Sequence, residues 1–173
     1  FYEEAVRVPF LMQWGNKLPK GKIDVCLNTV DIMPTLLSFM EIDCPEEVEG
    51  RDLSKVLLKE KGAEEPEGVL MQGTGATAIF EDGHEWRAYR TKRHTYAVYL
   101  ADGEEHLYDN LEDPLQMKNL ANDPAYSELK EKLKEAMYAE MRRVHDHFRP
   151  CSYYDGTYIK DRIIRFTSAK ETE

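Results

Sequence analysis

One stretch, AYSELKEKLKEAMYAEMRRVHDHF at residues 125–148, constrains the fold of this chain more than any other. Its apolar side chains recur three and four residues apart with Glu and Lys between them, which is the pattern of a helix that buries one face. They are Leu129, Leu133, Met137, Met141, Val144 and Phe148. A helix over residues 125–148 therefore needs an apolar surface to cover.

Short runs that begin at Val69 can supply that surface. VLMQGTGATAIF, EWRAYRTKR, TYAVYLA and EHLYDN are rich in aromatic and β-branched residues, and the turn sequences EDGH, KRH and ADGEE separate them. Such runs with Asp-Gly turns between them are typical of an antiparallel meander. The predicted fold class is α+β: a small antiparallel sheet of about four strands covered by the long C-terminal helix.

The first sixty residues show a different sequence pattern. Residues 5–14, AVRVPFLMQW, predict a buried strand, and VDIMPTLLSFM predicts a short buried helix with Asp31 as its cap and Pro34 in its first turn. A further helical turn is predicted after Gly50, before the exposed linker KEKGAEEPEG. We therefore expect a strand and helix piece at 1–60 and a second unit at 61–173. A strand around residues 158–166 is also predicted.

Composition limits the partners. The chain has 173 residues, of which 42% are hydrophobic, so it can form a core, and its formal net charge is −10. A surface this acidic argues against binding the backbone of a nucleic acid, and no apolar run is long enough to span a membrane. Cys26, Cys44 and Cys151 are too far apart to suggest a disulfide framework or a metal knuckle, so the redox compartment stays open.

Few residues show the spacing of a reactive site. His145 and His147 are two apart on the predicted helix and project in different directions, so they fit solvated helix-end residues better than metal ligands. GTGATA at 73–78 lacks the spacing of a phosphate-binding loop. No Ser, Cys or Thr stands in a recognisable nucleophile motif.

The one local basic concentration is HEWRAYRTKRH at residues 84–94. Its guanidinium groups suit the oxygens of a sulfate or phosphate group, and a strand with outward charges is the alternative. The acidic run LYDNLEDPLQMKNLANDP at 107–124 has two readings as well. Asp109, Asp113 and Asp123 lack the regular spacing of a calcium loop, which favours a sheet-to-helix connector with Asx turns and a helix cap at Asp123.

Four stretches, in this order, resemble the C-terminal part of the type I sulfatases of the alkaline phosphatase-like superfamily. FYEEAVRVPFLMQW resembles the family's Y-E-E-x-x-R-V-P strand, and VDIMPTLLSFMEIDCPEEVEGRDL its V-D-x-x-P-T-L-L helix and G-x-[SD]-L turn. EWRAYRTKRHTYAVYL is similar to its W-R-x-x-R-T strand pair, and the acidic run to its L-Y-D-L-x-x-D-P turn. Together they cover most of the chain.

The resemblance implies a parent enzyme that hydrolyses sulfate esters with a formylglycine nucleophile and a divalent cation, usually calcium. The nucleophile arises from the first residue of a C-x-P-S-R or S-x-P-S-R motif, whereas Cys26, Cys44 and Cys151 open CLNT, CPEE and CSYY. The family's metal ligands lie in its larger N-terminal domain. No catalytic or metal residue, and no cofactor, is therefore assigned to this chain, which is expected to be inactive alone.

The resemblance also implies a role and partners. Residues 1–60 would be the last strand and helix of the large domain, and 61–173 the subdomain that packs on that domain and helps wall the substrate cleft. His84, Trp86, Arg87 and Arg90, with the stretch Gly73–Thr77, are the candidate wall residues. Without its large domain the apolar segment at 5–14 would be exposed, which predicts dimerisation through it. A periplasmic or secreted parent fits, and the compartment stays open.

Two other functions are also consistent with the sequence. The Trp86, Arg87 and Arg90 patch could belong to a non-catalytic module that binds sulfated or other anionic glycans. The chain could also be the C-terminal part of a related phosphonate or phosphate hydrolase.

Overall fold

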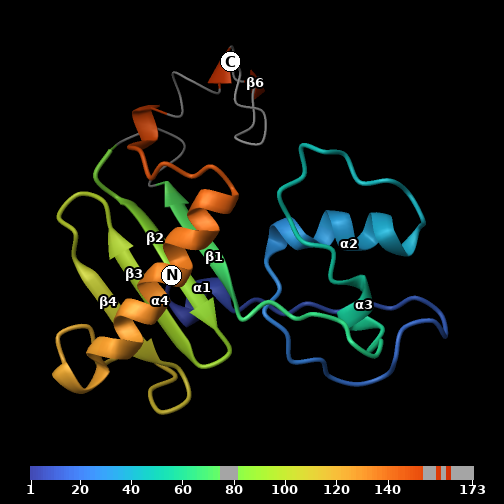
Figure 1. The fold of residues 1–173 in the computed structure, drawn as a ribbon, viewed down its shortest axis with the longest axis horizontal. Coiled ribbons are helices and arrows are strands. Elements are labelled where there is room, and N and C mark those ends of the chain that lie inside the picture. Colours follow the sequence, from blue (N-terminus) through green and yellow to red (C-terminus); the bar gives the residue numbers. More distant parts are fainter. Residues whose placement is uncertain (75–81, 154–158, 161–162, 165–173) are drawn as a thin grey trace.

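The computed structural model describes residues 1–74 and 82–153, together with the backbone of 159–160 and 163–164. Figure 1 shows two parts side by side. One is a four-stranded sheet with the long helix α4 across it, and the other carries the short helices α2 and α3 with long loops.

The sheet is the predicted meander. Its strands are β1 (Gly68–Thr74), β2 (Glu85–Thr91), β3 (His94–Tyr99) and β4 (Glu105–Asp109), and each pairs with the next in antiparallel register. Only Lys92 and Arg93 separate β2 from β3. The turn between β3 and β4 uses Gly103 at φ +71°, a conformation that glycine adopts without strain. The prediction of an α+β fold with this sheet is confirmed.

Helix α4 (Ser127–Arg143) covers one face of the sheet, as predicted. Leu133, Met137 and Met141 are buried against Leu70, Tyr89, Tyr96, Val98 and Leu107. The helix ends at Arg143 and not at Phe148. His145 and Phe148 adopt positive φ angles of 51° and 49°, so the chain leaves the helix axis there and turns toward the sheet.

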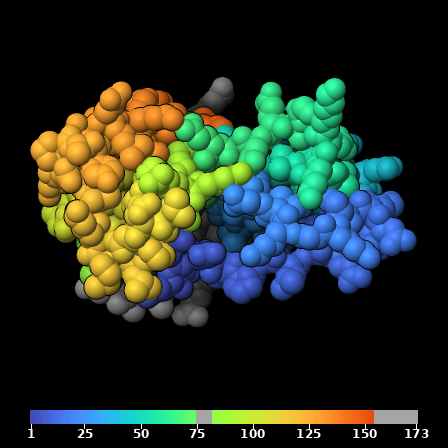
Figure 2. Space-filling view, turned by 90° about the horizontal axis from the view of Figure 1, so that it is seen from below, coloured from blue at the N-terminus to red at the C-terminus, as the bar shows by residue number. Residues whose placement is uncertain are grey.

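The other face of the sheet holds the start of the chain. Ala88 of β2 and Ala97 of β3 are direct partners, and their small side chains leave space in which Phe1 is buried beside Tyr108. The short helix α1 (Glu3–Val6) follows Phe1. Figure 2 shows these first residues against the region of β4 and the segment that follows it.

The prediction of a buried strand at 5–14 is wrong. Residues 5 and 6 belong to α1, and residues 7–14 form no helix or strand. Val8 and Leu11 are 64% and 93% exposed. A strand requires a neighbouring strand to satisfy its backbone groups, and no described strand lies beside this segment.

The predicted helix near residue 31 is present as a 3-10 turn (Thr29–Asp31) followed by α2 (Ile32–Phe39). Asp31 stands at the N-cap position of α2, as predicted, but its side chain makes no capping bond to that helix. Asn28 caps the 3-10 turn, and Asp31 completes a capping box with it. The helix is also less buried than predicted. Thr35 and Phe39 are buried, whereas Met33, Leu36 and Met40 are exposed because no described segment covers that face.

Asp31 links the turn that begins α2 to the segment around Arg51. Its carboxylate accepts the backbone N–H groups of Asn28 and Arg51, both at 2.8 Å. Gly50 lies so close to the Val30 carbonyl oxygen that an added Cβ would come within 2.0 Å of it. Helix α3 (Ser54–Leu57) follows as the predicted turn. The predicted linker at 59–68 is largely exposed up to Glu67, whereas its last residue, Gly68, is buried at the start of β1.

The predicted strand around 158–166 lies partly outside the described residues. Within that stretch β5 (Ile159–Lys160) pairs with β6 (Ile163–Ile164), apart from the main sheet. In the part of the chain that the structure describes, no helix has the length and apolar character needed to cross a membrane.

Candidate functional site

Three of the candidate wall residues lie on β2, but they do not share one surface. Side chains alternate between the two faces of a strand. Trp86 and Arg90 point to the face that holds Phe1 and Glu3, whereas Arg87 points to the face covered by the chain after α4. His84 lies in the turn just before β2 and is exposed.

Trp86 is half-buried and lies across β1. Its direct partner in the sheet is Gly73, and a Cβ at that position would come within 2.2 Å of the indole atoms Cε2 and Nε1. The Phe1 ring meets the indole at 5.3 Å between centroids, in an edge-on arrangement. Gly73 therefore provides the space for the indole, which explains a glycine within a strand. The rest of the Gly73–Thr77 candidate, from residue 75, lies outside the described residues.

Arg87 is buried, with its side chain 1% exposed, and pairs with Asp146, which is 2% exposed. Its Nη2 donates to Asp146 Oδ1 at 2.9 Å, its Nε donates to Oδ2, and Nη1 reaches the carbonyl oxygens of Gly73 and Trp86. The Phe148 ring stacks 4.7 Å from the guanidinium carbon. Burial opposes ionisation of Asp146, but the bonds from Arg87 prevail and hold its pKa below the usual value. In this arrangement the Arg87 side chain is buried and bonded to Asp146 and to backbone oxygens of β1 and β2.

Arg90 also has a carboxylate partner. Its Nε donates to Glu3 Oε1 at 2.6 Å and its Nη2 to Glu3 Oε2 at 3.1 Å. The backbone N–H of Glu3 donates to Gln116 Oε1 at 2.8 Å. Glu3 thus joins β2, the start of the chain and the segment after β4.

Two acids on either side of His84 hold the chain beyond α4. Asp82 accepts hydrogen bonds from the backbone N–H and the hydroxyl of Ser152, at 2.8 and 2.7 Å. Glu85 is buried and accepts the backbone N–H groups of Cys151 and Gly83. Burial opposes ionisation of Glu85, yet these N–H groups hold its pKa below the usual value. The backbone around His84 is therefore fixed from both sides.

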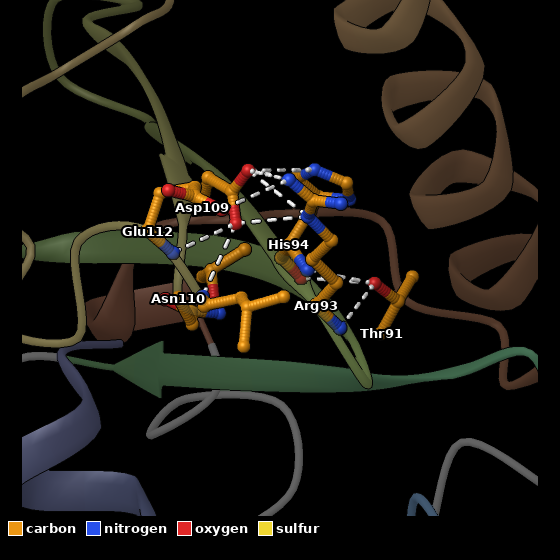
Figure 3. Close-up of polar contacts among 8 residues, drawn as sticks. Thr91, Arg93, His94, Asp109, Asn110 and Glu112 are labelled. Carbon is orange, nitrogen blue, oxygen red and sulfur yellow. Dashed lines mark hydrogen bonds and ion pairs between the residues drawn. The ribbon is translucent and has the colours of Figure 1, made fainter.

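The acidic run is a sheet-to-helix connector between β4 and α4. Figure 3 shows the polar contacts of Asp109 at its start. Asp109 accepts a two-pronged bond from Arg93, with Nη2 to Oδ2 at 2.7 Å, and the backbone N–H groups of Leu111 and Glu112. The bond from Arg93 is the main reason that the pKa of Asp109 falls to about 2. Asp113 accepts the Lys118 N–H, and Asp123 caps the next turn at Ala125. The predicted Asx turn at Asp109 and the cap at Asp123 are confirmed, whereas Asp113 closes a wider turn, because its carboxylate accepts the N–H five residues further on.

The sequence alone did not indicate the two acids that pair with the arginines of β2, Glu3 and Asp146, or the role of Glu85 in binding the Cys151 N–H. These partners are 87, 59 and 66 residues apart in sequence. Asp146 had one local signal, since it stands between two exposed histidines at the end of an amphipathic pattern. That pattern alone cannot show that the chain leaves the helix there.

The residues present do not fit a formylglycine or a calcium site. Cys26 and Cys151 are buried, Cys44 is exposed, and none of the three stands in the required motif. Within residues 1–74 and 82–153, no three His, Cys, Asp or Glu side chains come together as a metal site would require.

The chain is similar to known sulfatases over most of its length. It is 32% identical over 162 residues to the ulvan-active sulfatase of Formosa agariphila and 33% identical over 162 residues to the arylsulfatase of Clostridium perfringens. Each match covers 91% of this chain and 31% of the relative. The chain thus spans about a third of the length of these curated relatives.

Solved structures show the same arrangement. A 2-O GAG sulfatase superposes with a TM-score of 0.57 at 28% identity, over 75% of this chain and 26% of that protein. The phosphonate monoester hydrolase of Agrobacterium radiobacter superposes with a TM-score of 0.54 over 65% of this chain and 24% of that protein, and its 20% identity shows the fold alone.

Fold and relatives together define the C-terminal part of an alkaline phosphatase-like sulfatase. Residues 1–143 match the family described as N-sulphoglucosamine sulphohydrolase, C-terminal, and the chain belongs to that family.

Proposed function

We propose that residues 1–173 act as the C-terminal part of a sulfuric ester hydrolase whose catalytic part precedes them. The observation that carries this proposal is the family match over residues 1–143. The formylglycine nucleophile and the divalent cation, calcium in the first instance, would come from the preceding part, because the residues described here offer no place for either.

Within that enzyme we assign the candidate wall residues two different roles. His84 is exposed and Trp86 is half-buried, so both can face a substrate cleft. Arg87 and Arg90 are held by Asp146 and Glu3 and would set the position of the strand that carries Trp86. The wall would then consist of His84 and Trp86, supported by the two arginines.

The partner is the preceding catalytic part, to which residues 1–60 would belong. The exposed side chains of Met33, Leu36 and Met40 form an apolar face on α2, and Val8, Phe10 and Leu11 add to the exposed apolar surface at 5–14. Apolar surface of this extent favours a partner. In the chain alone, we expect the segment at 5–14 to pair two copies. Light scattering should show a dimer that a Leu11→Glu variant weakens, and a wild-type monomer at all concentrations would contradict this.

A chimera tests the proposed function. Residues 1–173 would replace the matching segment of the Clostridium perfringens arylsulfatase, with which they share 33% identity. We expect the chimera to release sulfate from an aryl sulfate, and the isolated chain to release none. A folded chimera that binds its cation but releases no sulfate would contradict the proposal.

Two variants of the chimera test the wall. His84→Ala and Trp86→Ala should raise KM for a sulfated saccharide more than they lower kcat, because a wall residue contributes mainly to substrate binding. Arg142→Ala is the matched control, since its exposed pair with Glu135 lies on α4. An unchanged KM in both variants would mean that neither His84 nor Trp86 lines the cleft.

A further inference from the structure

A cavity of about 820 Å³ lies where the linker after α3 leads into the sheet. One side is formed by Lys55 and Val56 of α3 and by residues 62–67 of the linker, and the other by Tyr89 of β2 and Glu140 of α4. Figure 1 shows this linker passing from α3 to β1. Ligand pockets in proteins have volumes of roughly 300–1,000 Å³, so this cavity has the size of a small-molecule site.

The hydroxyl of Tyr89 is a polar group without a partner at this cavity. Tyr89 is only 5% exposed, and its hydroxyl makes no hydrogen bond to any residue that the structure describes. Gly68 lies against the end of the ring, since a Cβ there would come within 2.7 Å of Tyr89 Cε1 and Cζ, and this contact holds the ring in place. Buried hydroxyl groups are normally hydrogen-bonded, so this one indicates a place for a ligand group.

The Tyr89 hydroxyl is available as a donor as well as an acceptor. Burial, with the Glu140 carboxylate nearby, raises the pKa of Tyr89 to about 12, so the hydroxyl keeps its proton at neutral pH.

The charged side chains around the cavity nearly balance one another. The lining holds two bases, Arg51 and Lys55, and five acids: Asp52, Glu64, Glu65, Glu67 and Glu140. Three of these acids have basic partners at 2.7 to 2.8 Å, which are Glu140 with Arg51, Glu65 with Lys92 and Glu67 with Lys132. Within the described residues Glu64 and Lys55 form no ion pair, and their charges are opposite. The cavity therefore has little net charge with which to attract a free ion.

These groups suit the hydroxyl groups of a neutral sugar. A sugar hydroxyl donates and accepts hydrogen bonds, and here Lys55 is a donor, Glu64 an acceptor and the Tyr89 hydroxyl both. Val56 and Pro66 add apolar surface on which the C–H face of a sugar ring can pack. A sulfate or phosphate group would instead face the five carboxylates. For a metal ion, the described residues hold no cluster of three His, Cys, Asp or Glu side chains.

We propose that the cavity between α3, the linker and Tyr89 binds a neutral sugar unit. Tyr89 would bond a sugar hydroxyl at the buried end of the cavity, and the exposed side chains of Lys55 and Glu64 would bond others at its opening. His84 and Trp86 do not line this cavity, so the site is separate from the proposed cleft wall. The inference is independent of the proposed sulfatase activity.

Titration of the chain with cellobiose, lactose and maltose, followed by two-dimensional NMR of the backbone amides, tests the site. At least one of these neutral disaccharides should give saturable shifts that gather on Val56, Ala63 and Tyr89. A sulfated form of the disaccharide that binds best should bind at least about fivefold more weakly, because its sulfate would meet charges of the same sign.

Two substitutions with matched controls locate the sugar. Tyr89→Phe removes only the hydroxyl and should weaken binding about fivefold, the typical cost of one hydrogen bond. Tyr138→Phe should leave the affinity unchanged, since Tyr138 is a partly buried tyrosine of α4 that does not line the cavity. Ala63→Trp should fill the cavity and abolish binding, whereas Ala101→Trp, in the exposed turn between β3 and β4, should not.

Several results would overturn the proposal. One is the absence of saturable shifts with all three disaccharides, and another is equal affinity of Tyr89→Phe and the wild type. Shifts on His84 and Trp86 in place of Val56, Ala63 and Tyr89 would place the sugar at the cleft wall. Tighter binding of the sulfated disaccharide would contradict the assignment of a neutral ligand.

Discussion

Arg90 and Glu3 form a two-pronged ion pair between β2 and the start of the chain, 87 residues apart in sequence. The Glu3 backbone also donates to Gln116, so the same residue reaches the connector after β4. These contacts, with Phe1 in the space over Ala88 and Ala97, are what attach residues 1–6 to the sheet.

Breaking this pair should loosen the start of the chain. We expect Arg90→Ala to lower the free energy of unfolding by about 1–3 kcal/mol, because it leaves a largely buried carboxylate without its donors. Urea denaturation followed by tryptophan emission measures this. Arg142→Ala, which breaks an exposed pair, should cost less than about 1 kcal/mol. Equal effects of the two variants would argue that the Arg90 pair is an ordinary surface contact.

Removing one partner of the buried Arg87 and Asp146 pair should lower the free energy of unfolding more than removing both. Asp146→Ala leaves an uncompensated buried guanidinium and should cost about 3–5 kcal/mol. Replacing both, as in Arg87→Met with Asp146→Leu, should cost clearly less, since no charge remains buried. Denaturant titration of the three proteins decides this. A double variant as unstable as the single one would mean that the pair's geometry, and not its charge, holds the chain after α4.

Acid should weaken the contact between β4 and α4. Burial opposes ionisation of Glu105, but hydrogen bonds from Lys130, Lys134 and Tyr96 lower its pKa to about 2. A lowered carboxyl pKa stabilises the fold above the unfolded value of 4.5, and this contribution is lost as the pH falls from there toward about 2. Because the side chain is 21% exposed, we expect about 1–3 kcal/mol. Glu105→Gln should flatten the pH dependence of unfolding in this window, and an unchanged slope would contradict the assignment.

Gly73 should tolerate no side chain. A methyl group there would come within 2.2 Å of the Trp86 indole, so Gly73→Ala must displace the ring. We expect a shift in Trp86 emission and a loss of about 1–3 kcal/mol of stability. Gly103→Ala is a useful comparison, because its cost arises from φ +71° and not from contact. An unchanged emission spectrum in Gly73→Ala would mean that the indole does not lie across β1.

The features predicted correctly from sequence depend on local patterns. The apolar spacing from Leu129 to Met141 places α4 on the sheet, and short side chains such as those of Asp109, Asp113 and Asp123 act on backbone groups only a few residues away. Such local interactions can be predicted without knowing the rest of the fold.

The features that were missed depend on distant partners. Residues 5–14 have strand-forming side chains, but a strand also needs a neighbour, and none is described beside them. The pattern of α4 continues to Phe148, yet the helix ends five residues earlier because Asp146 turns to Arg87. The face of β2 on which the Arg87 side chain lies follows from the register of the sheet. Sequence spacing alone does not give that register.

The most direct test of the account is sulfate release by the complete protein that contains residues 1–173, measured beside the isolated chain. We predict that the complete protein releases sulfate from an aryl sulfate and that the isolated chain does not. Turnover by the isolated chain at an enzyme-like rate, or cleavage of a phosphonate monoester by the complete protein without any sulfate release, would contradict it.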